Sequence, residues 1–208
     1  TCGKAIYNRK EQSTWLKINP QIIDNKQIIS GSEIILQYKE DAIDNIYIPA
    51  NANVKTYTQG IQKHKQESDE LNNNQIKLDF VNDLSGNILN GSFYEGRLDS
   101  LQVDGMATTL YHVFEDSIYQ GKNTASGDAI IMQFYNNDVD KIIVSGASRG
   151  EYKPDTASSK IEGPIAYSSE IIKYNVNQEE TDLHGDAKIR YTNMNLDAGY
   201  VNVNWVTN

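Results

Sequence analysis

One segment of this chain occurs twice, and this repetition limits the folds that the chain can adopt. Residues 30–50 read SGSEIILQYKEDAIDNIYIPA, and residues 126–146 read SGDAIIMQFYNNDVDKIIVSG, so the two segments align without a gap. Identical pairs include the Ser-Gly that opens each copy and the aspartates Asp44 and Asp140. A repeat of this kind predicts an architecture that is built from one recurring supersecondary unit.

The repeated unit has the alternation of a β-hairpin. A third copy of its second half lies at residues 98–105, where the order is aliphatic, Asp, any, aliphatic, any, aliphatic, any, small. Alternation with a period of two is typical of a strand that buries one face. Polar turns such as Lys39 to Ala42 and Asn136 to Asp138 join the two strands of each unit. The sequence therefore predicts an all-β, antiparallel and elongated fold made of repeated hairpins.

The C-terminal part continues the alternation in a more divergent form. We expect strands from Ala166 to Trp205, with a turn at Asp182 to Gly185 and a β-bulge at Gly199, where the alternation changes phase. Residues 18–29, interrupted by Pro20, predict two short strands near the start.

Two polar stretches interrupt the pattern. Gln59 to Asn74 predicts a short exposed helix or a loop, and Tyr152 to Gly163, which contains Pro154, predicts a loop or linker. We therefore divide the chain into hairpin repeats at residues 1–152, a linker or loop at 153–163, and strands that continue the same sheet at 164–208.

Composition narrows the classes of function. The formal charge of −9 and the pI near 4.8 disfavour nucleic acid as a partner, because the field of the protein repels polyanions. The histidines His64, His112 and His184 are far apart and have no neighbours at metal-ligand spacing. No nucleophile elbow or phosphate-binding loop is present. We expect no enzyme, no metal and no cofactor.

Several short motifs resemble those of the OstA/LptA family of organic-solvent-tolerance and lipopolysaccharide-transport proteins. They also resemble the N-terminal periplasmic domain of LptD. The segments that carry the resemblance are Ala5–Tyr7 followed by Ile18–Pro20 and Ile29–Ser32, then Val103–Ala107, Val144–Ala147, His184–Tyr191 and Met194–Val201. The polar insertion at Gln59 to Asn74 and the length of the chain depart from a single transport jellyroll. The resemblance fits both an OstA-like periplasmic protein and the periplasmic part of a translocon.

The resemblance implies a β-jellyroll whose inner faces enclose an apolar groove for the acyl chains of lipid A. It implies a periplasmic, lipopolysaccharide-binding transport protein, with association with the outer membrane as an option, that contacts other jellyroll subunits by edge-strand stacking. The natural edge is the strand Val201 to Trp205. By alternation, the groove residues are Ile34, Leu36, Tyr38, Ile46, Ile48, Leu101, Val103, Ile130, Met132, Phe134, Ile142 and Val144.

Three alternatives accompany this interpretation. The same apolar residues suit a closed core, and the same hairpins suit a structural or adhesive β-repeat scaffold without a lipid ligand. Lys188, Arg190 and Arg149 are candidates for lipid phosphates, although solvated surface charge is the commoner role of such residues. A polysaccharide-binding jellyroll is a third hypothesis, since Trp15 and Trp205 are suited to stacking on sugars.

Overall fold

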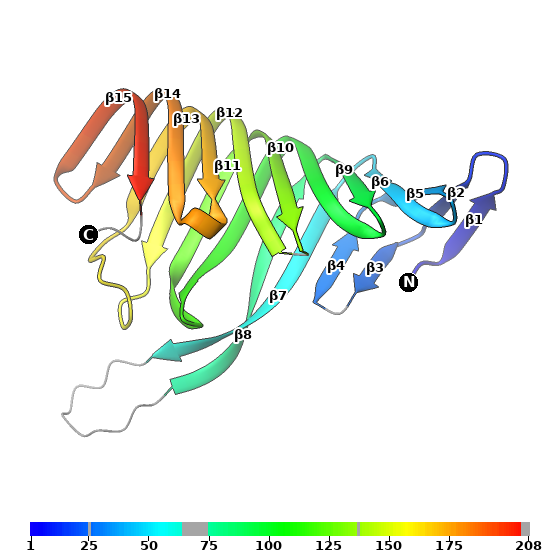
Figure 1. Cartoon of the computed structure of the whole chain (residues 1–208), viewed down its shortest axis with the longest axis horizontal. Coiled ribbons are helices and arrows are strands. Elements are labelled where there is room, and N and C mark those ends of the chain that lie inside the picture. The colour runs from blue at the N-terminus through cyan, green and yellow to red at the C-terminus, as the bar shows by residue number, and fades with distance from the viewer. Residues whose placement is uncertain (25, 64–74, 137, 205–208) are drawn as a thin grey trace.

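A computed structural model describes residues 1–24, 26–63, 75–136 and 138–204 of the chain (Figure 1). The described residues form a 15-stranded sheet and one 3-10 turn at Val176–Gln178. All pairs of strands are antiparallel except for a single parallel bridge between Ile118 and Ile61. The prediction of an all-β protein is confirmed, and the jellyroll that the resemblance implies stays a prediction. No helix of the described residues is long and apolar enough to cross a membrane.

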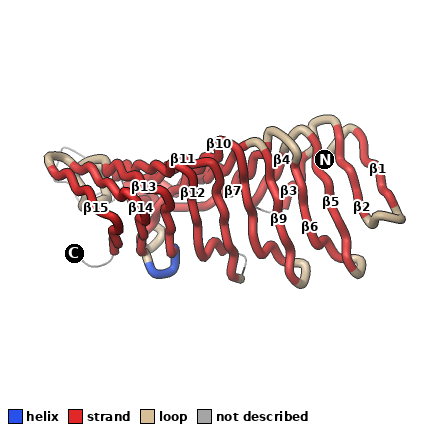
Figure 2. The backbone as a smooth tube through the Cα atoms, turned by 90° about the horizontal axis from the view of Figure 1, so that it is seen from above, coloured by secondary structure: helices blue, strands red, loops and turns tan. Residues whose placement is uncertain are grey.

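The strands in chain order are β1 (Lys4–Asn8), β2 (Ser13–Lys17), β3 (Gln21–Asp24), β4 (Gln27–Ser30), β5 (Glu33–Lys39), β6 (Ala42–Ile48), β7 (Ala52–Lys63), β8 (Gln75–Gly86), β9 (Ile88–Tyr94), β10 (Arg97–Glu115), β11 (Ile118–Tyr135), β12 (Asp138–Pro154), β13 (Ile165–Asn175), β14 (Glu180–Tyr191) and β15 (Met194–Asn204). Figure 2 shows the sheet from above, running from β1 at one end to β15 at the other.

The sheet consists of two leaves that share the long strands. Leaf A contains β1, β2, β5, β6 and β9, followed by residues 97–104, 129–135, 138–145, 171–175, 180–184 and 200–204 of β10 to β15. Leaf B contains β3, β4, β7 and β8, followed by residues 107–115, 118–126, 148–154, 165–168, 187–191 and 194–198 of the same strands.

Bulges at matching heights form the corner between the leaves. The registers of β10 to β14 all shift along one line, and β10, β12 and β14 each place two consecutive residues with positive φ there. In each pair the first residue is glycine: Gly105, Gly146 and Gly185. Glycine adopts positive φ without steric cost, and an inserted residue bends a strand. Gly105 and Gly146, the small residues that end two of the sequence repeats, therefore lie at the corner.

The strand β13 shows directly that the leaves face each other. Tyr167 and Tyr174 are seven positions apart in this strand, which places their Cα atoms roughly 23 Å apart in a straight strand. Their hydroxyl oxygens are instead 2.6 Å apart, with the register shift of β13 between the two residues. The bend thus brings side chains of leaf A and leaf B into contact.

The repeated hairpins are present as predicted from the sequence. Glu33–Lys39 and Ala42–Ile48 form β5 and β6, and residues 129–135 and 138–145 form the matching parts of β11 and β12. Glu40 and Asp41 in the first turn both have positive φ, which is the geometry of a type I′ hairpin turn.

Three local expectations need correction. Asp182 to Gly185 is not a turn but lies within β14, and the chain reverses instead at the 3-10 turn before Glu180. The irregularity predicted at Gly199 is present, but β14 supplies the extra residue, because Gly185 and Asp186 stand opposite Gly199 alone. Gln59 to Lys63 belong to strand β7, and residues 64–74 lie outside the described residues.

The segment between β12 and β13 is a loop that packs on the sheet. The Asp155 amide donates to the Gln120 carbonyl at 2.7 Å, and Ser158 Oγ donates to the Tyr119 carbonyl. Strand β12 leads into this loop and strand β13 leaves it, and the two strands pair directly with each other. The sheet therefore continues without a break across residues 155–164.

Candidate functional site

The interior of leaf A contains all of the residues that the sequence analysis assigned to a lipid groove. They belong to one apolar cluster, which extends across β5, β6, β10, β11 and β12. Nine of them are buried: Ile34, Leu36, Ile46, Ile48, Leu101, Val103, Ile130, Ile142 and Val144. Tyr38, Met132 and Phe134 are partly buried and pack against the others. The register explains this, since cross-strand pairs such as Val103 with Ile130 and Ile130 with Val144 share one face.

Side chains of leaf B complete this interior. Val54, Leu84, Ala125, Tyr167 and Ile189 are buried in the same cluster as the residues of leaf A. The residues at the centre of the interior are fully enclosed, as in an ordinary hydrophobic core.

Burial decreases toward the two ends of the folded sheet. Leu16 in β2 and Ile22 in β3 are only partly buried at one end, and Leu196, Val201 and Val203 in β15 are partly buried at the other. The apolar interior therefore reaches the surface at both ends, where β1, β3 and β15 have no partner on their outer side among the described strands.

A polar cluster lies inside the C-terminal half of the interior. Tyr167 donates its hydroxyl to Asn123 Oδ1 at 2.5 Å, and its hydroxyl oxygen is 2.6 Å from that of Tyr174. Burial raises the pKa of Tyr167 to about 12 and that of Tyr174 well above its ordinary value. Both tyrosines therefore keep their protons at neutral pH, and because the Tyr167 hydroxyl donates to Asn123, the Tyr174 hydroxyl donates to Tyr167. No sequence signal predicted the pairing of these two tyrosines.

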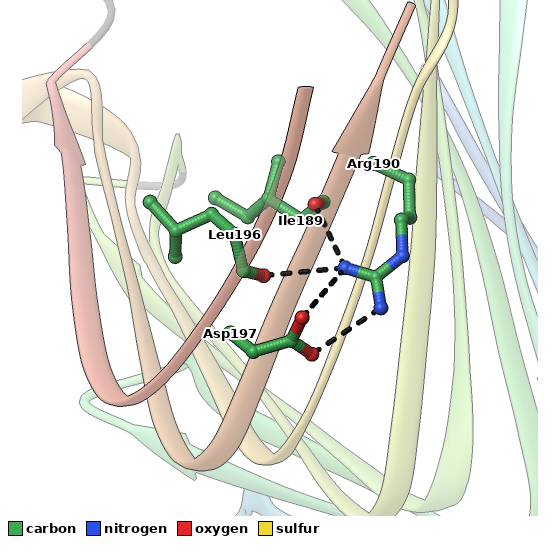
Figure 3. A network of polar contacts seen from close by, with 4 residues as sticks. All are labelled: Ile189, Arg190, Leu196 and Asp197. Atoms are coloured by element: carbon green, nitrogen blue, oxygen red, sulfur yellow. Dashed lines mark hydrogen bonds and ion pairs between the residues drawn. The ribbon is translucent and has the colours of Figure 1, made fainter. Parts of the chain in front are cut away.

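The candidate phosphate-binding cations lie on the outer face of leaf B. Arg190 binds Asp197 of the neighbouring strand β15 through two contacts, Nη1 to Oδ2 at 3.3 Å and Nη2 to Oδ1 at 3.2 Å (Figure 3). Its Nη1 also donates to the carbonyls of Ile189 and Leu196. Arg149 and Lys188 are exposed, and they lie on the two strands that flank Ser168, each directly opposite this residue. These charges face away from the apolar interior.

The two described histidines have separate environments. The backbone amide of His112 donates to Asn82 Oδ1 at 2.8 Å, and its Nδ1 is 3.0 Å from the same oxygen. Burial, and secondly the charge of Lys122, lower the pKa of His112. His184 instead lies against the ring of Tyr200, and His64 lies outside the described residues. No group of three metal-ligating side chains occurs within the described part of the chain.

A second candidate site lies on the outer face of leaf A, which the sequence analysis did not assign. A hollow of about 650 Å³ crosses β2, β5, β6, β9 and β10. Trp15, named above as a sugar-stacking residue, lines this hollow together with Tyr47. Strand alternation alone places both side chains outward, but only the register brings them together.

Comparison of the chain with protein-family models, curated proteins and solved structures finds no match. The fold and the sites define the class of protein: an antiparallel β-sheet folded into two leaves around an apolar interior. The function is therefore argued from the geometry alone.

Proposed function

We propose that this chain is a non-enzymatic, periplasmic lipid carrier, which holds the acyl chains of lipopolysaccharide between its two leaves and passes them toward the outer membrane. The observation that carries the proposal is the single apolar interior, which runs along the whole folded sheet and reaches the surface at both ends. A lipid chain that enters at one end meets mainly apolar side chains, with the hydroxyl groups of Tyr167 and Tyr174 as a polar point in the C-terminal half.

Binding in this interior requires the leaves to move apart. Each buried methylene group of an acyl chain contributes about 0.8 kcal/mol, so a chain of ordinary length offsets the contacts that the leaves lose. The partly buried residues Tyr38, Met132 and Phe134 lie at the margin of leaf A, away from the corner. Separation of the leaves is expected to begin at this margin, because the corner is fixed by continuous strands.

The resemblance to lipopolysaccharide-transport proteins supports the choice of lipid. Its motifs include Gly105, Gly146 and Gly185 with the residues around them, and these are the residues that build the corner. The net charge of −9 is compatible with an anionic lipid as long as the phosphates stay in solvent. The charged outer face contributes nothing to this binding mode.

A structural scaffold without a lipid ligand is the second candidate. It is favoured by the full burial of Ile34, Ile48, Val103, Ile130 and Val144, which have the exposure of ordinary core residues. The two functions differ in whether the interior ever admits a ligand.

Site-specific photocrosslinking distinguishes the two. A small diazirine amino acid is placed at Leu36 or Met132, on the inner face, and at Gln133 as the outward-facing neighbour of Met132. With purified lipopolysaccharide we expect crosslinks at the two inner positions and none at Gln133. No crosslink at any position supports the scaffold, whereas equal crosslinking at Gln133 indicates surface adsorption and contradicts the carrier.

A further inference from the structure

The hollow on the outer face of leaf A is built from two neighbouring rows of side chains. Both rows cross the strands β2, β5, β6, β9 and β10 in register. The first row is Trp15, Ile35, Tyr47, Asn90 and Gln102, and the second is Ser13, Gln37, Asn45, Ser92 and Ser100. All of these residues line the hollow. One row thus begins with aromatic and aliphatic side chains, and the other consists of amides and hydroxyls.

The first row contains two aromatic residues, Trp15 and Tyr47. Ile35 separates Trp15 from Tyr47, so their backbone positions lie two strands apart, or roughly 9 to 10 Å. Lys17 holds the indole in place: its Nζ lies 5.0 Å from the ring centroid and forms a 2.6 Å ion pair with Glu33. A ligand in the hollow would therefore use the other face of the indole. Two aromatic side chains at this spacing match alternate units of an extended chain of sugar rings.

The polar residues of the hollow offer both donors and acceptors. The Gln102 amide nitrogen donates to Asp104 at 2.9 Å, which leaves its carbonyl oxygen as an acceptor. Ser92 Oγ and Ser100 Oγ are 2.8 Å apart and form a hydroxyl pair. Amides and hydroxyls in these numbers suit a ligand that carries many hydroxyl groups.

Ser13 provides an independent sign that the hollow is a binding site. Its side chain lines the hollow and is 4% exposed, and its Oγ has no hydrogen-bond partner among the described residues. A buried hydroxyl without a partner costs free energy, and native structures rarely retain one without a reason. A ligand hydroxyl that reaches this end of the hollow would supply the missing partner.

The charge of the hollow selects among sugars. Glu11 is the charged side chain that lines it, and the whole chain carries −9. A carboxylate accepts hydrogen bonds from neutral sugar hydroxyls but repels uronic acids and sulfated or phosphorylated glycans. We propose that the outer hollow of leaf A binds a neutral oligosaccharide chain, with Trp15 and Tyr47 stacking on alternate sugar rings. This site is separate from the apolar interior and does not depend on lipid binding.

Tryptophan fluorescence tests this proposal, because Trp15 is one of two tryptophans in the chain. A Trp205→Phe variant leaves Trp15 as the reporter, and it is titrated with cellohexaose, chitohexaose and mannohexaose, with polygalacturonate as the anionic comparison. We expect a saturable change in fluorescence with at least one neutral hexasaccharide and none with polygalacturonate. No saturable change with any of the three neutral chains at millimolar concentration overturns the proposal.

Two matched variants locate the binding. Tyr47→Ala removes the second ring and is expected to weaken binding at least tenfold, measured by both fluorescence and calorimetry. Tyr135→Ala removes a tyrosine that is 68% exposed at the end of β11, outside the hollow, and is expected to leave affinity unchanged. Equal loss in both variants, or no loss in Tyr47→Ala, would show that the sugar binds elsewhere. Circular dichroism of each variant checks that the fold is retained.

Discussion

The buried tyrosine pair makes stability depend on pH through single side chains. The pKa of Tyr167 is about 12 in the folded protein because of burial, against an ordinary value of 10. Below pH 10 both the folded and the unfolded chain keep this proton. Between pH 10 and pH 12 the unfolded chain loses it first, so the free energy of unfolding falls as the pH rises. The expected fall is about 2 to 3 kcal/mol for this group.

The variant Tyr167→Phe tests this link by denaturant unfolding at a series of pH values. At neutral pH we expect a loss of about 1 to 3 kcal/mol, because Asn123 and Tyr174 lose a hydrogen-bond partner. Above pH 10 the variant should lose stability less steeply than the parent protein. Tyr135→Phe, at an exposed position, should change neither quantity. A parallel slope for Tyr167→Phe and the parent would mean that burial of Tyr167 does not control this pH dependence.

The sequence predicts on which face of the sheet a side chain lies, but it does not predict which residues the side chain contacts. Alternation assigned Leu36 and Ile130 to the inner face, and both are buried there. It said nothing of the contact between Tyr167 and Tyr174, because that contact depends on a bend within one strand. The sequence also did not place Tyr47 beside Trp15, because the two residues come together only through two cross-strand registers.

At the scale of the element, glycine at the corner determines where a long strand changes leaf. Gly146 has a φ of +81°, and a Cβ built there overlaps the side chain of Asp128. Gly146→Ala should lower the free energy of unfolding by about 1 to 2 kcal/mol, because an alanine is strained at positive φ. Gly199→Ala is the matched control: its added Cβ meets no atom within 4 Å, and its φ is not positive.

Thermal and denaturant unfolding of both variants measure the difference. Gly199→Ala should be neutral or slightly stabilising, since alanine restricts the unfolded chain. If Gly146→Ala is equally neutral, the corner does not depend on the left-handed conformation of this residue.

The hairpins were predictable from the repeat, whereas the bends between them were not. Turn residues identified the turn at Glu40 and Asp41 correctly. The same reasoning failed at Asp182 to Gly185, because Gly185 serves the corner bulge within β14 instead of a chain reversal. Glycine with positive φ serves both purposes, and a single sequence does not distinguish them.

At the scale of the whole molecule, the folded sheet has two open ends of different composition. One end presents two short strands, β1 and β3, and the other presents β15, which belongs to both leaves. Periodicity predicted which face of each strand is apolar. It could not predict whether two apolar faces enclose a groove or a core, because both place the same residues inward. The distinction depends on the distance between the leaves, which the corner bulges set.

Unlike ends allow head-to-tail contacts between copies, which form rings or open filaments. The next copy would pair with β15 through main-chain hydrogen bonds and cover its half-buried apolar residues. We therefore expect association that increases with protein concentration in sedimentation velocity experiments. Val201→Lys should abolish it, because Val201 pairs with the buried Leu183 and a lysine there places a charge on the inner face at the open end. Asn202→Lys, one residue along on the exposed outer face, should leave association intact. Loss of association in both variants would assign the contact to the outer face of β15, and association that survives in both would place it away from this strand.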